Sequence, residues 1–270
     1  MKRLMMLLLS VTLLCSFSGI AAANTLADVK KKGILVAGVK DSSPPFGYID
    51  EKTRSLVGYD VDFCKFIAKK LGVQLELKPV TSATRMPQLI AGNIDIIAAT
   101  MTKNAERAKQ IDFSYTYFFT GQKFLTKKGT VKKLADLEGK KIGTAKGSTS
   151  EQNAKKALPT ATILSFDDYP QAFLALQQGK VAAVTTDESI LAGIHAKAPD
   201  KGQYEIPNIQ ISEEPYGLGI RKGEKDFLDV VNATLLEMEK KGDAKKIFDK
   251  WFGPRSETPL KRTFQITPDK

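Results

Sequence analysis

The sequence predicts an α/β fold in which parallel-rich sheets are flanked by helices. Short β-type runs alternate with helical patterns along almost the whole chain, and strands joined by helices of this length usually pair in parallel. The 270-residue length suits one large or two medium α/β lobes. Two apolar β-like segments that interrupt the alternation favour two lobes joined by a pair of hinge strands.

Residues 1–23 have the composition of a signal peptide. Lys2 and Arg3 form a positive start, residues 4–20 are mostly apolar, and the alanines at 21–23 offer a cleavage site. An uncleaved anchor is the alternative, but serines, threonines and a glycine interrupt the apolar run, and a span needs about 20 strongly apolar residues. We therefore expect cleavage after Ala23 and a periplasmic protein.

Charge and cysteine content exclude several classes of function. The formal net charge of +11 falls by two when Lys2 and Arg3 are removed. The remaining lysines are spread over helices and turns, which predicts a solvated basic surface with a modest attraction for anionic ligands and no nucleic-acid partner. Cys64 would be the one cysteine of the mature chain, so no internal disulfide is expected.

The expected elements follow one another in a regular order. Strands are predicted at residues 34–39, 74–80, 95–99, 141–145, 162–166 and 181–186. Helices are predicted at residues 60–71, 86–91, 150–158, 170–178, 189–196 and 227–251. The helix at 60–71 shows the usual end signals, with Asp60 in its first turn, Lys70 in its last and Gly72 after it.

The hinge segments divide the chain into discontinuous units. Residues 121–126 and 216–221 are apolar and β-like, and a block rich in strand–helix–strand units lies between them. We predict a first lobe from residues 24–121 and 217–253, a second lobe from 122–216, and an extended, proline-containing C-terminal tail from 254–270.

A candidate binding site follows the third predicted strand. The buried-looking run at 95–99 ends in Thr100 and Thr102, and Arg107 comes a few residues later. Strand-end donors and a guanidinium, which meets two oxygens at once, suit a small carboxylate. This pattern indicates a secreted receptor for a small molecule.

An ordered set of motifs is similar to the family 3 extracellular solute-binding proteins, the polar amino-acid receptors of ABC importers. The motifs are Gly58–Leu71, Pro45-Phe46, Glu106-Arg107, Asp112-Phe113-Ser114, the stretch 134–140 and Trp251-Phe252. The resemblance implies a two-lobed periplasmic binding protein fold of type II that closes on an L-amino acid by hinge motion. It also implies a membrane permease as partner, a monomer and no cofactor.

The same resemblance assigns ligand contacts from both lobes. Arg107 is expected to clamp the ligand α-carboxylate, with Thr102 and the backbone near Thr100 beside it. Ser148 and Thr149, at a helix N-terminus of the second lobe, are expected to meet the ligand across the cleft. A plain serine cap is the alternative for the segment around Ser148.

Other positions are expected to bind the α-ammonium group or to line the cleft. Asp187, at the end of a strand, matches the family's acceptor for the α-ammonium, although such an aspartate can instead cap the following helix. Phe46 and Tyr59 are expected to wall the cleft, because an aromatic face covers aliphatic carbon at low entropy cost.

Specificity is predicted from charge. Relatives that take cationic amino acids carry an acid just after the first strand, where this chain has Lys40. Arg85 resembles an arginine of acidic-amino-acid receptors, and Tyr169 would add a hydroxyl from the opposite lobe. Buried cations need a counter-charge, so we expect glutamate or aspartate, followed by glutamine or asparagine or a broad polar range. The alternatives are a solvated Lys40, an Arg85 paired with a surface acid, and a Tyr169 that only packs.

Two other classes of function compete with transport. Periplasmic dehydratases resemble this family, but the one histidine of the chain, His195, lies in a helical stretch beyond the predicted cleft residues, and no catalytic triad, metal cluster or phosphate loop is visible. We therefore expect no enzyme. A sensor or adhesin would use the same closure, read by a surface partner instead of a permease.

Overall fold

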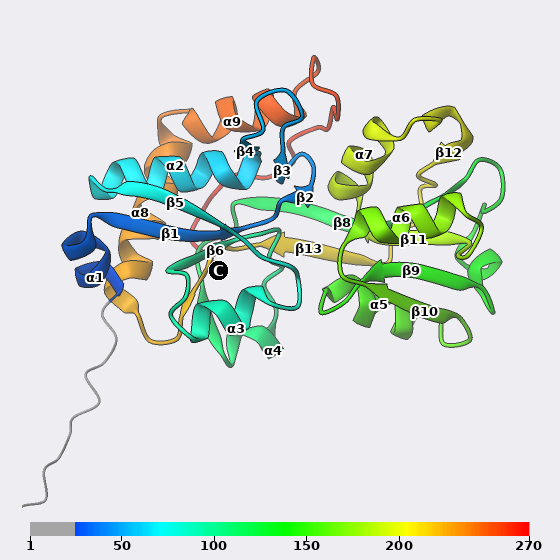
Figure 1. The fold of residues 1–270 in the computed structure, drawn as a ribbon, viewed down its shortest axis with the longest axis horizontal. Coiled ribbons are helices and arrows are strands. Elements are labelled where there is room, and N and C mark those ends of the chain that lie inside the picture. Colours follow the sequence, from blue (N-terminus) through cyan, green and yellow to red (C-terminus); the bar gives the residue numbers. More distant parts are fainter. Residues whose placement is uncertain (1–24, 270) are drawn as a thin grey trace, which may run out of the picture.

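The computed structural model describes residues 25–269 of the chain, and the predicted signal peptide lies outside them. Two lobes lie side by side along the long axis of the molecule, and the strands β8 and β13 run between them (Figure 1). Within the described part, no helix is both long enough and apolar enough to cross a bilayer.

The first lobe is built on a five-stranded sheet with the order β5-β1-β6-β14-β7. Strand β1 pairs in parallel with β5 and β6, while β14 runs antiparallel to β6 and β7. The strands are β1 (Ile34–Val39), β5 (Gln74–Pro79), β6 (Ile96–Ala98), β7 (Ile111–Phe113) and β14 (Gly219–Arg221). The helices of this lobe are α1 (Thr25–Lys32), α2 (Tyr59–Leu71), α3 (Arg85–Ile90), α4 (Ala105–Ala108), α8 (Lys225–Lys240) and α9 (Asp243–Phe252).

The second lobe is built on a six-stranded sheet with the order β10-β9-β11-β8-β12, with β13 also paired to β8. Its strands are β8 (Phe118–Lys127), β9 (Lys141–Ala145), β10 (Thr162–Phe166), β11 (Ala183–Asp187), β12 (Tyr204–Glu205) and β13 (Ser212–Tyr216). Its helices are α5 (Thr149–Ala157), α6 (Tyr169–Gln177) and α7 (Glu188–Lys197), with short 3-10 turns η1 (Leu134–Leu137) and η2 (Lys201–Gln203). Parallel pairing of β9 with β10 and β11 confirms the α/β prediction.

The long strand β8 connects the two lobes. Its first half pairs antiparallel with β13, from Phe118 opposite Tyr216 to Gln122 opposite Ser212. Its second half pairs antiparallel with β11, from Gln122 opposite Asp187 onward. The polypeptide therefore passes twice between the lobes along paired strands, as Figure 1 shows.

The sequence analysis was wrong about one long helix and missed several elements, including α1, α4 and one small sheet. The stretch predicted as a single helix at 227–251 forms α8 and α9, because Gly242 adopts the left-handed conformation (φ 76°) that ends a helix. The three-stranded sheet of β2 (Ser42–Ser43), β3 (Gly47–Ile49) and β4 (Leu56–Val57) was not predicted. Its strands are too short to show a period-two pattern.

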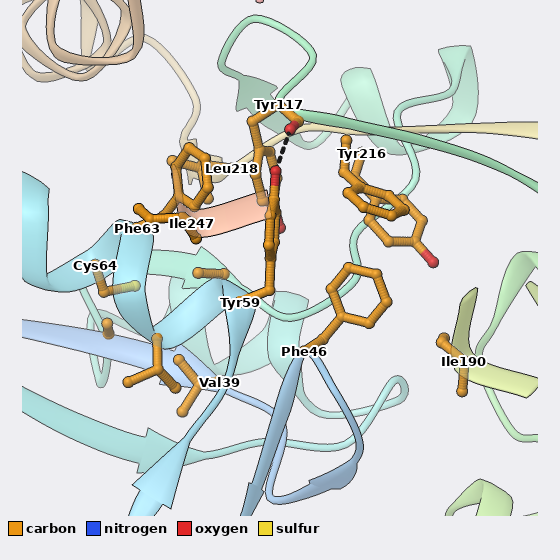
Figure 2. Close-up of a cluster of buried hydrophobic side chains, with 14 of the residues drawn as sticks. Val39, Phe46, Tyr59, Phe63, Cys64, Tyr117, Ile190, Tyr216, Leu218 and Ile247 are labelled. Carbon is orange, nitrogen blue, oxygen red and sulfur yellow. Dashed lines mark hydrogen bonds between the residues drawn. The ribbon is translucent and has the colours of Figure 1, made fainter. Parts of the chain in front are cut away.

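A cluster of buried aromatic rings lies where the first lobe meets the hinge strands. Figure 2 shows Phe46, Tyr59, Tyr117 and Tyr216 from four different segments of the chain. The rings of Phe46 and Phe118 are 4.9 Å apart and those of Phe118 and Tyr216 are 5.6 Å apart. Because large rings bury much apolar area, this cluster fixes where the hinge strands leave the first lobe.

The C-terminal segment continues this packing without forming a helix or strand between residues 254 and 269. Arg262 donates to both carboxylate oxygens of Glu239 in α8, at 2.9 and 2.5 Å. Phe264 packs against Phe118 and Phe248, and Ile266 is buried. The segment is thereby attached to the same lobe as α8 and α9.

Candidate ligand-binding site

Arg107 is buried in the short helix α4. Asn104 caps this helix, since its Oδ1 accepts from the Arg107 backbone N–H at 2.9 Å. The Arg107 guanidinium donates from Nη1 to the carbonyl of Thr102 at 2.9 Å and from Nη2 to the carbonyl of Gly147, in the other lobe, at 3.3 Å. Burial lowers the pKa of Arg107, while the charge of Glu214 opposes that change. The guanidinium therefore faces the space between the lobes and has donors left for a carboxylate.

The backbone after β6 is strained at Thr100. This β-branched residue has φ of 49°, in the left-handed region, which costs on the order of 1–3 kcal/mol. Its N–H donates to Asp60 Oδ2 at 2.9 Å, and its carbonyl accepts from Arg85 Nη1 at 3.0 Å. The strained turn thus orients Arg85 from one side and is held by Asp60 from the other.

Lys40 and Arg85 are both buried and close enough to repel each other. Lys40 Nζ donates to Ser82 Oγ at 2.8 Å, and its pKa is well below the ordinary value because of burial and then of Arg85. Arg85 donates to the carbonyls of Ala99 and Thr100, and its Nε is buried without a partner. Burial, followed by repulsion from Arg107, lowers the pKa of Arg85 to about 9.

These contacts exclude the alternatives considered for both cations. Lys40 is 4% exposed and Arg85 is 2% exposed, so neither is a solvated surface group. Their hydrogen bonds go to a hydroxyl and to backbone carbonyls, not to a surface carboxylate. The buried Asp60 acts on both cations from a distance, but its oxygens accept from the Thr100 N–H and the Tyr117 hydroxyl. Neither cation has an ion-pair partner among the described residues, so a bound anion would supply a direct counter-charge.

Asp187 ends β11 in the second lobe and has one unsatisfied oxygen. Although it occupies the N-cap position of α7, its side chain makes no capping hydrogen bond, so the capping alternative is wrong. Its Oδ2 accepts from the Tyr216 hydroxyl, and its Oδ1 is buried without a partner. Burial, with Glu214 adding to it, raises the pKa of Asp187 to about 7. A cationic group beside Oδ1 would satisfy both its charge and its lone pairs.

The start of α5 contributes hydroxyls that are already engaged. Ser148 Oγ accepts from the Glu151 N–H at 3.1 Å and donates to the Ala145 carbonyl at 2.6 Å, as the serine-cap alternative predicts. The Thr149 hydroxyl donates to Glu214 Oε2 at 2.8 Å. Tyr169 is 4% exposed, and its hydroxyl pKa is raised by burial and then by Asp187. Tyr169 therefore lies near the unsatisfied aspartate.

The sequence analysis missed Glu214, which lies in β13 between the lobes. It is 1% exposed, and its carboxylate accepts from the hydroxyls of Thr102 and Thr149, which come from different lobes. Period-two alternation with the buried Tyr216 was the available signal. The run Ser212-Glu213-Glu214 resembles a solvated turn, however, and its pairing with β8 is not evident from local sequence.

Phe46 and Tyr59 belong to the aromatic cluster. Tyr59 lies against Phe63 and Tyr117, and its hydroxyl donates to the Tyr117 carbonyl at 3.0 Å (Figure 2). Phe46 packs edge-on against Tyr216, the partner of Asp187. Phe46 thus supports the candidate site through Tyr216, while the role of Tyr59 as a cleft wall remains a prediction that its packing does not favour.

The two lobes touch at two glycines. A Cβ at Gly147 would lie 2.8 Å from Cα of Ala83, and a Cβ at Gly193 would lie 1.9 Å from the Pro44 carbonyl oxygen. Gly147 also has a positive φ of 75°. These approaches, together with the Arg107–Gly147 hydrogen bond, describe a closed arrangement of the lobes around the buried polar residues.

A metal site and a catalytic histidine have less support than a ligand-binding site. Between residues 25 and 269, no group of three or more histidine, cysteine, aspartate or glutamate side chains is placed to hold a metal ion. His195 is half-buried, and its Nε2 lies 2.9 Å from the Lys201 carbonyl and 3.2 Å from that of Tyr204. Its contacts fasten the turn after α7.

Comparison with known proteins agrees with this geometry. The model for bacterial extracellular solute-binding proteins, family 3, matches residues 35–254. The chain belongs to this family. The family membership and the two-lobed fold that the sequence predicted are thereby confirmed.

Individual proteins that resemble the chain are named for different amino acids. The ABC transporter glutamine-binding protein GlnH of Bacillus subtilis is 39% identical over 233 residues, covering 84% of each chain. The glutamate/aspartate import solute-binding protein of Salmonella typhimurium is 35% identical, covering 92% of this chain and 86% of that one. A solved ancestral arginine-binding protein bound to glutamine is 43% identical, with a TM-score of 0.78 over 82% of this chain and 98% of that one.

Proposed function

We propose that this family 3 protein is the amino-acid-binding component of an ABC importer and that it closes on glutamate or aspartate. The single observation that carries the acidic specificity is the burial of Lys40 and Arg85, neither of which forms an ion pair with a carboxylate of the described residues. A ligand with one negative charge would engage Arg107 alone. A second carboxylate would give the other two cations a counter-charge in direct contact.

The proposed binding mode uses groups from both lobes. Arg107 takes the α-carboxylate in a two-oxygen contact. The free Oδ1 of Asp187 accepts from the α-ammonium. Lys40 and Arg85 meet the side-chain carboxylate, and Tyr169 closes over the ligand from the second lobe. Closure then removes all of these charges from water together, which strengthens each contact.

Glutamine is the second candidate, because GlnH of Bacillus subtilis is named a glutamine-binding protein and this chain is similar to it over most of its length. A side-chain amide can accept from Lys40 through its oxygen, but it leaves the two buried charges uncompensated. The proposal therefore ranks glutamine and asparagine below the acids. Lobe closure around a solute suits delivery to a membrane permease, and we propose a monomeric, periplasmic protein without catalytic activity.

Calorimetric titration tests this proposal. The chain without residues 1–23, refolded free of ligand, is titrated at pH 8 with glutamate, aspartate, glutamine, asparagine and arginine. We expect tight binding of the two acids and binding of the amides weaker by about a hundredfold, which corresponds to nearly 3 kcal/mol. Equal or tighter binding of glutamine would contradict the acidic specificity, and binding of none would contradict the amino-acid function.

A further inference from the structure

Glu214 is a buried carboxylate at the crossing between the lobes, and the predicted ligand contacts do not include it. It is 1% exposed, whereas its neighbour Glu213 on the same strand is exposed. A buried carboxylate is stabilised only when its oxygens are well satisfied. The partners of Glu214 therefore indicate what the residue does.

Both oxygens of Glu214 are fully engaged. Oε2 accepts from the Thr102 hydroxyl at 2.6 Å and from the Thr149 hydroxyl at 2.8 Å. Oε1 accepts from Asn153 Nδ2 at 2.9 Å and from the Ser212 hydroxyl at 2.5 Å. The two threonine hydroxyl oxygens are themselves 3.4 Å apart.

The two threonine partners of Glu214 come from different lobes. Thr102 follows β6 of the first lobe, Thr149 begins α5 of the second, and Glu214 lies on the hinge strand between them. One oxygen atom thus joins both lobes, and it can do so only when they are closed. Because an ionised carboxylate has no proton to give, both hydroxyls must donate to it, and each hydroxyl has a single proton.

We propose that Glu214 is a positioning residue that pins Thr102 to Thr149 in the closed arrangement and thereby slows release of the ligand. The pin rests on the proposed function, since it acts on the same cleft. Because Thr102 and Thr149 both give their hydroxyl protons to Glu214, these hydroxyls have no proton left for the ligand. The α-carboxylate is therefore held by Arg107 and backbone N–H groups. The hydroxyls are free to accept from a cationic group instead.

The rate of ligand release distinguishes a pin from a residue that only supports the fold. Stopped-flow binding of glutamate is measured for the wild type, E214Q, T149V, the double variant E214Q/T149V and the control E213Q. A glutamine side chain is uncharged and has one acceptor oxygen. If that oxygen faces Thr102 and Thr149, its NH2 group meets the donor Nδ2 of Asn153, and if it faces Asn153, the contact between the lobes is lost. We expect E214Q to raise the dissociation rate about tenfold or more, because hydrogen bonds to a charged group are lost. The association rate should stay within about twofold.

The remaining variants test whether Glu214 acts through Thr149. T149V should raise the dissociation rate similarly, the double variant should release ligand no faster than the faster single variant, and E213Q should match the wild type. The melting temperature of the ligand-free chain should be nearly the same for E214Q and E213Q. An unchanged dissociation rate in E214Q, or effects that multiply in the double variant, would overturn the pin while leaving the proposed function intact.

A second measurement keeps the pin testable if glutamate does not bind. Spin labels on E106C and K156C, exposed positions on the two lobes, report the interlobe distance without ligand, and the native Cys64 is buried. We expect E214Q to reduce the fraction of closed molecules relative to E213Q. Equal closed fractions would overturn the pin, whatever the ligand proves to be.

Discussion

The two lobes bring opposite charges to the candidate site. The lobe of the first sheet contributes the buried cations Lys40, Arg85 and Arg107, while the second lobe and the hinge strand contribute Asp187 and Glu214. The first lobe also buries Asp60, but this carboxylate is occupied by the Thr100 N–H and the Tyr117 hydroxyl. On the proposed function, we infer that the first lobe takes the anionic groups of the ligand and the second its cation.

This asymmetry separates affinity from specificity. Arg107 and Asp187 address groups that every amino acid has, so we assign them the common affinity. Lys40 and Arg85 address the part that varies, so we assign them the choice of ligand. Glycines at the contact between the lobes decide whether the two halves can meet at all. Substitutions in each group should therefore have different signatures.

The largest effect is expected at Arg107. Replacing it by alanine removes the two-oxygen contact to the α-carboxylate and should weaken binding of every amino acid by about a thousandfold, since truncating a buried charged partner costs several kcal/mol. Calorimetry with glutamate and glutamine measures the loss. Arg107→Lys is the matched control, because it keeps the charge but not the fork and should recover part of the affinity. Retained micromolar binding in Arg107→Ala would disprove the assignment.

The next largest effect is expected at Asp187, with a dependence on pH. Its pKa of about 7 in the closed arrangement lies above the ordinary value of 3.8, chiefly because of burial, so near neutral pH part of the closed, ligand-free protein carries a proton there. A bound ammonium favours the ionised carboxylate, and binding should release that proton. Affinity should rise with pH through pH 7, by about tenfold per unit at most. The rise should end near pH 8, and affinity should fall again as Arg85, with a pKa of about 9, begins to lose its proton.

Titrations at pH 5.5, 7 and 8.5 measure this dependence. Asp187→Asn keeps the shape of the side chain but cannot ionise. It should bind about a hundredfold more weakly at pH 8.5, on the scale of a buried charged contact. Its affinity should also lose the increase between pH 5.5 and 8.5. The same pH profile in wild type and variant would show that another group is responsible.

A selective effect is expected at Lys40. Lys40→Met removes one of the two cations assigned to the side-chain carboxylate while keeping the apolar length of the side chain. It should weaken glutamate by about tenfold or more and glutamine by less, because a hydrogen bond between two charged groups is lost for glutamate and one to a neutral amide for glutamine, and a charged hydrogen bond contributes about 1.5–3 kcal/mol. Lys69→Met, at an exposed position of α2, is the control. An equal loss for both ligands would place Lys40 outside the specificity site.

The smallest effect is expected at Gly193, where the lobes touch. Alanine within α7 favours the helix by up to about 1 kcal/mol, yet its Cβ would meet the Pro44 carbonyl of the other lobe. Gly193→Ala should therefore melt no lower than the wild type when ligand-free and bind glutamate several-fold more weakly. A variant with unchanged affinity would mean that the lobes close differently around the ligand.

Much of this fold could be predicted from sequence because its signals are local. Strands β1, β9 and β10 have the predicted limits, and each is a run of residues with β propensity between turns. The break between α8 and α9 was missed because Gly242 lies inside a continuous amphipathic pattern, and only its left-handed backbone ends α8. The sheet of β2, β3 and β4 depends on pairing between very short segments.

The residues of the candidate site also fall into two groups, those that local sequence indicates and those that depend on contacts distant in the sequence. Motif position indicated four residues that follow strands or lie in the first turn of helices, and the structure buries all of them: Arg107, Asp187, Lys40 and Arg85. Glu214 could not be recognised, because its importance comes from Thr102 and Thr149, which are distant in the sequence. The use of Ser148 as a helix cap also became clear only from its hydrogen bonds.

A crystal structure of the chain grown with glutamate tests the opposite-charge account most directly. The account predicts the α-carboxylate on Arg107, the ammonium on Asp187 Oδ1, and the side-chain carboxylate between Lys40 and Arg85. A glutamate whose side chain lies away from Lys40 and Arg85, or whose ammonium has no contact with Asp187, would contradict it.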